Sequence, residues 1–390
     1  MVAADFLLCW APCLAGAMRV LIAPDGFGGT LSAVEAAEAI AAGWALAAPA
    51  DVLDLAPLSD GGPGFIDVLA AALPDSRRQS VIVEDPLARP VQAELLFDGD
   101  TAYVESAQAC GLHLLTLQER DPLITTSYGV GQLLLTALTA GVTRIVIGLG
   151  GSATNDGGAG LLAALGVARL DESGTRLASG GADLRRLATL SGQPDPRLRG
   201  VTLVAATDVD APLLGIRGAS AVFGPQKGAS REDVSQLDVA LSGWADALEG
   251  HLQVRVREEA GAGAAGGLGA ALFALGAHRE PGISLVQELV GLAPRVAAAQ
   301  LVVTGEGTFD HSSLTGKVVS GVAAAAAVVA VPCLVLAGQV TVGRREAAAA
   351  GIEASYAVAD GVGVPAALAR PGPELGALAA RVAGQWSRPV

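Results

Sequence analysis

Short runs of β-branched and other apolar residues recur along this chain, and each run ends near glycine, proline or aspartate. Alanine- and leucine-rich segments of helical character lie between them. Residues 19–72 alternate strand, helix, strand, loop and helix, which is the opening of a parallel β-α sheet. The same order resumes near residue 290, with strands expected at 301–303 and 333–336 and a closing helix at 375–386.

The middle of the chain has a different pattern. Three short runs within residues 81–104 are joined by Pro or Asp-Gly-Asp turns, which predicts antiparallel hairpins. Buried strands are then expected at 145–147 and 201–206, and a helix at 128–140 precedes the first of them. The simplest architecture is one α/β domain made of both chain ends, with a second α/β domain inserted between them. The expected limits are 18–80 with 290–390 for the first domain and 81–289 for the second.

The stretch 144–160 reads R-I-V-I-G-L-G-G-S-A-T-N-D-G-G-A-G. A buried strand, a glycine-rich turn and a helix follow one another, which is a common way to build a pocket for anionic groups. A G-x-G-x-x-A match begins at Gly148 and is typical of a dinucleotide fold, but the crowded run Asn155–Gly158 favours a site with more oxygen ligands. The plainer interpretation is a turn that only packs a helix on the sheet.

The formal net charge of the 390 residues is −14 and the pI is near 4.7, which argues against a nucleic-acid or anionic-membrane surface. No apolar run in the body of the chain reaches about 18 residues without Gly, Pro or charge, so we expect no membrane span. The scattered cysteines include no C-x-x-C pair, which fits a reducing, cytoplasmic location. Residues 1–17 lack a basic start, so we interpret them as a disordered extension, with an export signal as the alternative.

Lysine is nearly absent from the chain. Lys227 and Lys317 are its two lysines, and every other basic position except histidine is arginine. A lysine is expected to persist where a compact point charge is needed and the wide guanidinium fork does not fit. Both lysines lie beside glycine, so we expect them at a site for anionic groups, with chance survival on a solvated loop as the alternative.

Five loops share one design, in which a buried strand ends and a carboxylate follows beside Gly, Pro or Asn. Ligands of open parallel sheets bind at the carboxyl ends of the strands, so five such loops indicate one shared site, although turns favour Asp and Gly in any case. Gathered carboxylates imply bound Mg²⁺, a proton-accepting role or both, and with two lysines and glycine amides they match phosphoryl transfer from a metal nucleotide. The carboxylates are Asp25, Asp60, Asp156, Asp208 with Asp210, and Glu306.

These loops belong to a longer series of motifs. In chain order the series consists of Ala23-Pro24-Asp25-x-Phe27, Ser59-Asp60-Gly61-Gly62-x-Gly64, Glu105-x-Ala107 with Gly111-Leu112, Thr125-Thr126-x-x-Gly129, Gly148 through Gly160, Asp208-Val209-x-x-Pro212-Leu213, Gly224-Pro225-Gln226-Lys227-Gly228, Gly263-Ala264-x-Gly266-Gly267, and Thr304-Gly305-Glu306-Gly307 through Lys317. The series resembles the bacterial type I glycerate kinases (glycerate 2-kinases), and the resemblance runs from Met18 to the C-terminus.

The resemblance implies ATP- and Mg²⁺-dependent phosphorylation of D-glycerate, usually at the 2-hydroxyl. It also implies a Rossmann-like parallel-sheet domain formed by both chain ends, an inserted mixed-sheet α/β domain, and an active site in the cleft between them. This chain has Gly26 and Gly28 where the family usually has Ser and Lys, and Thr308-Phe309 where it usually has Arg-Leu. Both departures remove a cation that could hold phosphate or the substrate carboxylate.

We expect Asp208 to accept the hydroxyl proton or to bind the metal. Asp156, with Asn155, is expected to act in catalysis by binding Mg²⁺ or orienting phosphates, and helix capping is its structural alternative. Lys317 and Lys227 are expected to offset the charge of the transferring phosphate, with Lys317 in a catalytic role.

The remaining expected substrate- and phosphate-binding residues lie in the acidic and glycine-rich loops. Turn formation is the structural alternative for the aspartates, and for Glu306 metal binding and loop closure both stay open. These residues are Asp25, Asp60, Gly150, Gly151, Ser152, Gly305, Glu306 and Asp310.

Two other function classes stay open. One is a nicotinamide-dependent dehydrogenase of a small hydroxy acid, with Asp171 at roughly the right spacing for a ribose contact. The other is a non-catalytic organic-acid binding protein. The expected partners are D-glycerate and ATP, without nucleic acid or membrane, in a monomer or homodimer. Whether the product is 2- or 3-phosphoglycerate also stays open.

Overall fold

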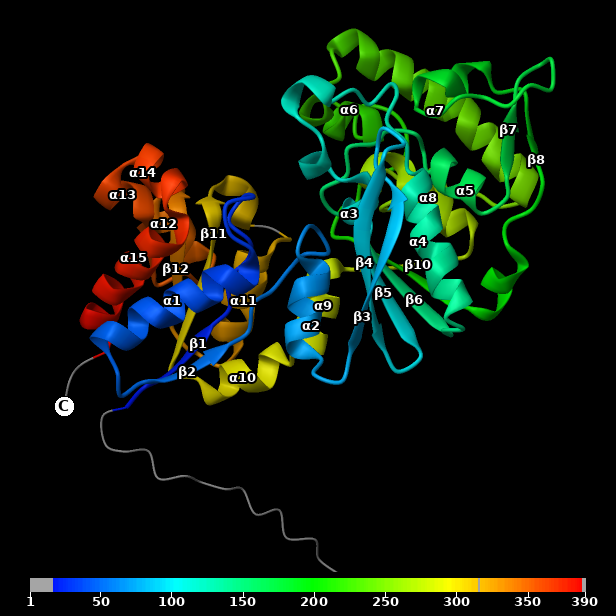
Figure 1. The fold of residues 1–390 in the computed structure, drawn as a ribbon. Helices are drawn as coiled ribbons and strands as arrows, with labels where there is room; N and C mark the ends of the chain where they lie inside the picture. Colours follow the sequence, from blue (N-terminus) through cyan, green and yellow to red (C-terminus); the bar gives the residue numbers. More distant parts are fainter. Residues whose placement is uncertain (1–16, 315, 388–390) are drawn as a thin grey trace, which may run out of the picture.

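The computed structural model describes residues 17–314 and 316–387, in two lobes that each contain one large β-sheet (Figure 1). The predicted α/β class is confirmed. Nearly all of the extension predicted at 1–17 lies outside the described residues. Within them, no helix has both the length and the apolar character needed to cross a membrane.

The first lobe contains a five-stranded, all-parallel sheet in the order β13-β12-β11-β1-β2. The chain runs outward from β1 to β2 in one direction and from β11 to β13 in the other, so β1 and β11 lie side by side at the point where the winding reverses. In such sheets the ligand crevice lies beyond the carboxyl ends of the strands at that point. The strands are β1 (Arg19–Ile22), β2 (Val52–Leu55), β11 (Leu301–Phe309), β12 (Cys333–Val340) and β13 (Ala354–Ala357).

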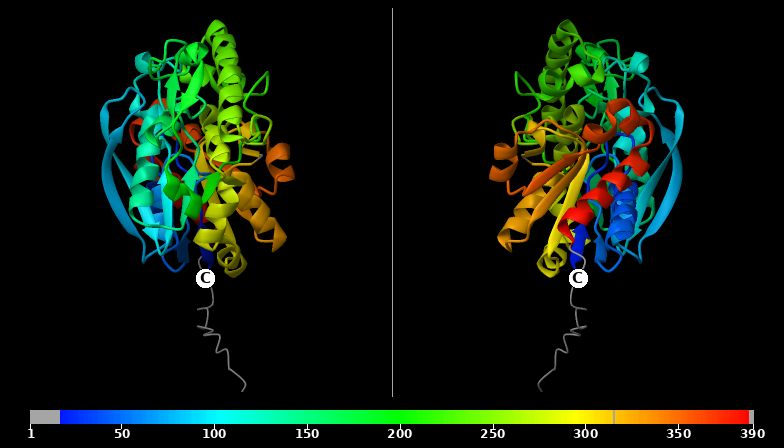
Figure 2. Two further views of the ribbon diagram at one scale, coloured as in Figure 1. Left: turned by 90° about the vertical axis from the view of Figure 1, so that its right-hand side faces the viewer. Right: turned by 90° about the vertical axis from the view of Figure 1, so that its left-hand side faces the viewer.

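Helices cover both faces of this sheet, as the reversal of winding requires (Figure 2). Helix α1 (Ala33–Ala47) begins at a capping box made by Ser32 and Glu35, and it packs beside α15 (Pro371–Trp386) on one face. Gly43 permits this close packing, because a Cβ there would overlap the Gly376 carbonyl. The other face is covered by α10 (Leu292–Ala298) and α11 (Val318–Val328).

The second lobe contains a six-stranded mixed sheet in the order β10-β9-β6-β5-β4-β3. Its first four strands are parallel, and β4 and β3 form the predicted antiparallel hairpins. A separate two-stranded sheet joins β7 (Ala168–Leu170) and β8 (Thr189–Ser191). The large sheet consists of β3 (Arg77–Glu84), β4 (Pro90–Asp98), β5 (Thr101–Glu105), β6 (Arg144–Gly148), β9 (Thr202–Ala206) and β10 (His278–Glu280).

All the crossover helices of the second sheet pack on one of its faces, because its parallel strands follow one another in a single direction. Its other face is covered by α2 (Phe65–Ala72) and α9 (Gly282–Val290), which lie between the two sheets (Figure 1). One apolar core therefore extends from the first sheet through these helices to the second. The helices of the outer face are α4 (Tyr128–Thr139), α5 (Ala159–Ala164), α7 (Arg231–Leu252) and α8 (Ala264–Ala274).

Strand β11 departs from the prediction of a short strand followed by a Thr-Gly-Glu-Gly loop. It continues to Phe309, and Gly305 pairs with Leu336 of β12 inside the sheet. A Cβ at Gly305 would overlap the Leu336 carbonyl, so this glycine serves close strand packing and not a turn. The pattern also missed β13 and several short helices, because they lack a long apolar run. The short helices are α3 (Ala107–Cys110), α6 (Ala219–Phe223), α12 (Arg344–Ala349), α13 (Val358–Val362) and α14 (Val364–Ala369).

All strands of the first sheet come from the two chain ends, and all strands of the second come from the segment between them. Strand β3 begins at Arg77, slightly before the expected boundary at residue 81. Helix α2 belongs by sequence to the first predicted domain but contacts the second sheet. The limits 18–80, 81–289 and 290–390 stay a prediction.

A buried polar network holds the glycine-rich loop between β6 and α5. Asp156 is fully buried, and its carboxylate accepts hydrogen bonds from the backbone N–H groups of Ser127, Gly158 and Gly160 and from the Ser127 hydroxyl, at 2.9 to 3.1 Å. It therefore satisfies donors at the starts of both α4 and α5. From the other side, the Lys227 amine donates to the Ser152 hydroxyl at 2.9 Å.

Lys227 itself is 2% exposed, and its second hydrogen bond, at 2.7 Å, goes to the Thr154 carbonyl. Burial lowers the pKa of its amine from 10.5 to about 8, because the charged form is poorly solvated there. An amine in this position stabilises the loop by holding two of its oxygens.

We predict that Lys227→Met changes the pH dependence of stability. Between pH about 8 and 10.5 the unfolded chain still binds a proton that the folded chain has released at Lys227. The wild-type protein should therefore gain stability relative to the variant across this window, by on the order of 3 kcal/mol. Denaturant unfolding of both proteins below and above the window measures the difference, and an unchanged difference would contradict the burial of this amine.

Candidate active site

A cleft of about 680 Å³ lies between the lobes, at the carboxyl ends of strands from both sheets. It is bordered by the loop after β1, the loop after β2, the glycine-rich loop after β6 and the segment around residues 112–120. Its lining includes the predicted residues Asp25, Asp60 and Gly151.

The loop after β2 carries Asp60 and crosses from the first sheet to the second. The N–H of Gly150 donates to the Gly61 carbonyl at 3.1 Å. A Cβ at Gly148 would overlap the same carbonyl, and one at Gly150 would overlap Gly62. These glycines thus allow two backbones to touch, and the contact places Asp60 over the ends of β6 and β9.

Asp25 lies at the point of winding reversal, just after β1. Its N–H donates to the Gly305 carbonyl of β11 at 2.8 Å, and its carboxylate accepts from the Gly26 N–H at 2.7 Å. Burial raises the pKa of Asp25, the charges of Asp60 and Glu306 act in the same direction, and together they bring it to about 8. A cation placed beside Asp25 would therefore stabilise the charged form of its carboxyl group.

Glu306 is 8% exposed, and burial raises its pKa. Its Oε1 atom is buried without a hydrogen-bond partner among the described residues. Lys317 lies nearby, since its charge lowers the pKa of Glu306 and of Asp25. The Lys317 amine donates to the Ser312 hydroxyl at 2.8 Å, and Asp310 accepts hydrogen bonds from the N–H and hydroxyl of Ser312.

Asp208 follows β9 in the second lobe and lies near Asp60, but it is not among the residues that line the cleft. Its carboxylate accepts from the Ile283 N–H at the start of α9, at 3.1 Å. Burial, with a smaller contribution from the charge of Asp60, raises the pKa of Asp208 to about 6. Gly282 fits between these two aspartates, because a Cβ there would overlap the Asp60 carbonyl and lie 3.3 Å from the Asp208 carboxylate.

The structure separates the predicted site residues into two groups. The charges of the first group act on one another, and two of its members, Asp25 and Asp60, line the cleft. The second group lies buried beneath the loop after β6, in hydrogen bonds that favour a structural role over contact with phosphate or metal. The first group is Asp25, Asp60, Asp208, Glu306, Asp310 and Lys317. The second is Ser152, Asn155, Asp156 and Lys227.

The predicted glycines act through the backbone. Gly150 and Gly305 pack against neighbouring backbone, and their close contacts leave no room for a side chain. Gly151, with a φ of 73°, lines the cleft. Asp171, the alternative ribose contact, instead accepts hydrogen bonds from Ser173 and Thr175 in its own turn and is not part of the cleft lining.

Sequence reasoning missed Arg120. This side chain lines the cleft from the second lobe, opposite the aspartates of the first. Its Nε is buried and has no hydrogen-bond partner within the described part of the chain. No local signal distinguished it, because it lies in a short polar segment, Glu119–Pro122, that resembles many surface turns. Only the packing of the lobes places this cation in the cleft.

Comparisons with known proteins identify the family of the chain. Residues 20–387 match the sequence model of the glycerate kinase family. The chain is 45% identical to glycerate kinase of Bacillus subtilis (strain 168), over 88% of this chain and 91% of that protein. It is 42% identical to glycerate 2-kinase of Escherichia coli (strain K12), over 89% and 92% of the two chains.

A crystal structure from Salmonella typhimurium LT2, provisionally described as glycerate kinase 2, superposes with a TM-score of 0.77. It is 41% identical, and the match covers 95% of this chain and 98% of that one. On the match over nearly its whole length and on these relatives, the chain is a kinase that belongs to the glycerate kinase family.

Proposed function

We propose that this enzyme transfers the γ-phosphoryl group of ATP to a hydroxyl of D-glycerate in the cleft between the lobes, giving 2-phosphoglycerate. The observation that carries the proposal is the meeting, across one cleft, of Asp25 and Asp60 from the first lobe with Arg120 from the second. An acidic patch suits a metal nucleotide, and an isolated guanidinium suits a carboxylate. The names of the relatives, glycerate kinase and glycerate 2-kinase, supply the acceptor.

In the proposed reaction the glycerate hydroxyl oxygen attacks the γ-phosphorus. The bond from that phosphorus to the oxygen of the β-phosphate breaks, and ADP leaves. Asp208 accepts the hydroxyl proton, because it lies near Asp60, which lines the cleft, and only one of its carboxylate oxygens accepts a hydrogen bond from another described residue. Lys317 offsets negative charge on the transferring group from the side of β11.

The acidic group fits a magnesium ion. The unpartnered Oε1 of Glu306 and the mutual charge repulsion at Asp25 are both features that a cation would relieve. Asp25, Asp60 and Glu306 would hold the ion, which supplies charge neutralisation at the phosphates when bound. Within residues 17–314 and 316–387, no three acidic, histidine or cysteine side chains lie close enough together to hold a metal ion by themselves, so oxygens of phosphate and water would have to complete the coordination.

Arg120 would bind the carboxylate of glycerate. Its buried, unpartnered Nε needs an acceptor, and a carboxylate provides two oxygens for a guanidinium fork. Gly28 and Thr308 stand in the first lobe where the family usually has basic residues. Arg120 would supply a cation from the second lobe in their place. It would leave the glycerate hydroxyl facing the first lobe and the nucleotide.

For the base, we predict that Asp208→Asn lowers kcat by about 10²–10⁴-fold with little change in glycerate affinity, because the amide cannot accept the proton. A coupled assay of ADP release and a binding titration with glycerate measure the two effects. Asp210→Asn is the matched control, since Asp210 is exposed and pairs with Arg279. Unchanged turnover in Asp208→Asn would remove this residue from the mechanism.

For the carboxylate contact, we predict that Arg120→Gln raises KM for glycerate by about ten- to a hundredfold, the worth of a charged hydrogen bond. KM for ATP should change little, and Arg120→Lys should recover part of the loss. Steady-state kinetics with each substrate varied in turn provide the measurement. Equal increases in both KM values would indicate a general disturbance of the cleft instead.

For the product, phosphorus NMR of the reaction mixture separates a phosphate on the 2-hydroxyl from one on the 3-hydroxyl. We expect 2-phosphoglycerate. A spectrum of 3-phosphoglycerate would overturn the proposed regiochemistry and leave the kinase activity intact. The absence of any phosphoglycerate with ATP and Mg²⁺ would overturn the function itself.

A further inference from the structure

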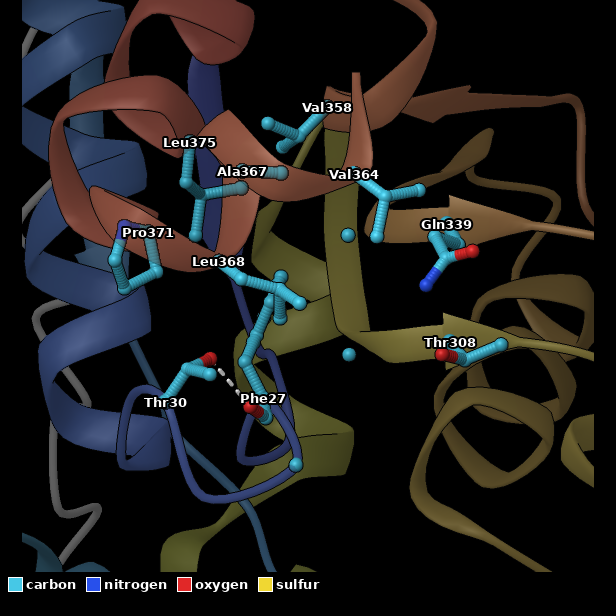
Figure 3. A pocket seen from close by; sticks show the side chains of 13 residues that line it. Phe27, Thr30, Thr308, Gln339, Val358, Val364, Ala367, Leu368, Pro371 and Leu375 are labelled. Atoms are coloured by element: carbon cyan, nitrogen blue, oxygen red, sulfur yellow. Dashed lines mark hydrogen bonds between the residues drawn. The ribbon is translucent and has the colours of Figure 1, made fainter. Parts of the chain in front are cut away.

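A second hollow, with largely apolar walls, lies beside the cleft (Figure 3). The carboxyl ends of β11 and β12 form its floor, and α13, α14 and α15 form its roof. In Figure 3 the side chains of Gln339 and Thr308 lie on one side, and those of Phe27, Leu368 and Pro371 on the other. None of these residues except Thr308 belongs to the site as predicted from the sequence or as described above.

We propose that this pocket binds the base of the nucleotide, a purine, and so determines which nucleotide the enzyme uses. The inference rests on the proposed function in taking the phosphoryl donor to be a nucleoside triphosphate. It adds the place of the base, the residues that contact it and the path by which the phosphates reach the acidic cleft.

The walls of the pocket suit the flat, apolar faces of a purine. Leu368 is 59% exposed and Val364 is 38% exposed, so two large apolar side chains face solvent at the pocket instead of a protein neighbour. Phe27 contributes an aromatic ring from below. Burying these surfaces against a base would remove apolar area from water and add contacts with an aromatic ring.

The polar groups suit the edge of a purine. The Gln339 amide can donate and accept, and the Thr308 hydroxyl can do the same. Neither side chain has a hydrogen bond to another described residue. A mostly apolar pocket with a few free polar groups is the usual composition of a small-molecule site.

The loop after β1 connects the pocket to the cleft, because Gly28 and Thr30 line both. Gly28 and Gly29 have φ values of 54° and 81°, and the N–H groups of both glycines make no hydrogen bond within the described chain. Successive free amides in such a conformation form a concavity that binds anions. With the base in the pocket, the triphosphate of the same nucleotide would extend past these amides toward Asp25.

These amides could bind an anion in place of the lysine that the family usually has at the position of Gly28. A lysine there would bring one charge, whereas two glycines leave the backbone N–H groups accessible. A Cβ at either glycine would meet no atom within 4 Å, so packing does not require glycine at these positions. What requires it is the left-handed backbone that presents the amides.

Ala367→Phe tests the proposal by filling the pocket from α14. Its matched control is Ala366→Phe, on the same helix at a position that is exposed and does not line the pocket. Calorimetric titrations with ATP and with inorganic tripolyphosphate compare base-dependent and phosphate-dependent binding. We expect Ala367→Phe to weaken ATP binding by about tenfold or more and to leave tripolyphosphate binding unchanged. Ala366→Phe should change neither.

The outcomes separate this inference from the proposed function. Wild-type affinity for ATP in Ala367→Phe would overturn the base pocket, even if glycerate is phosphorylated normally. ATP binding that depends on Ala367, without phosphorylation of glycerate, would leave the pocket standing and overturn the proposed reaction. A wild-type protein that binds no ATP would overturn both.

A second substitution keeps the test informative if Ala367→Phe does not fold. Gln339→Leu removes the hydrogen-bonding edge with almost no change in volume, so it should lower kcat/KM for ATP by about tenfold while KM for glycerate stays the same. It should also reduce the preference between ATP and GTP. An unchanged ratio of kcat/KM for the two nucleotides would overturn the assignment of Gln339 to the base.

Discussion

The arrangement of the site depends on one close contact between two backbones. The loop after β2 touches the glycine-rich loop after β6 at Gly61 and Gly62 on one side and Gly148 and Gly150 on the other. Side chains at these positions would push the loops apart. The contact brings the carboxyl ends of two separate sheets to one edge, and the cleft forms there.

A shared apolar core makes this contact stable. Helices α2 and α9 lie between the sheets, and their residues Leu69 and Val286 belong to one apolar cluster that includes strand residues of both sheets. The lobes are therefore packed together and do not meet only through a linker. Because α9 begins at Gly282, between Asp60 and Asp208, the same helix that joins the sheets also sets the spacing of two site carboxylates.

The site concentrates negative charge in a protein that already carries −14. Burial and the neighbouring carboxylates raise the pKa of Asp25 to about 8, which shows how poorly this position tolerates its own charge without a cation. Lys317 and Arg120 bring positive charge from opposite sides, and the free amides of Gly28 and Gly29 add uncharged donors. This combination lets an acidic enzyme take anionic substrates.

The sequence alone predicted the parallel β-α order, the antiparallel hairpins and the acidic loops at strand ends. These features depend on the local hydrophobic period and on turn chemistry. What the sequence did not separate was Asp156 from Asp208. Both follow a buried strand in a polar loop, yet one carboxylate is fully used in capping helices and the other is left with a free oxygen. Whether such a carboxylate caps helices or keeps an unpaired oxygen depends on which distant segments pack beside it, such as the start of α4 beside Asp156.

Lysine scarcity drew attention to Lys227 and Lys317, but it did not predict what each amine contacts. One amine is enclosed under the loop after β6, and the other faces the carboxylates beyond β11. Arg120 had no local signature at all. The sequence by itself thus determined the elements, their order and the inventory of charges, whereas the tertiary structure decided which charges share the cleft, because that depends on how two sheets pack across residues far apart in the chain.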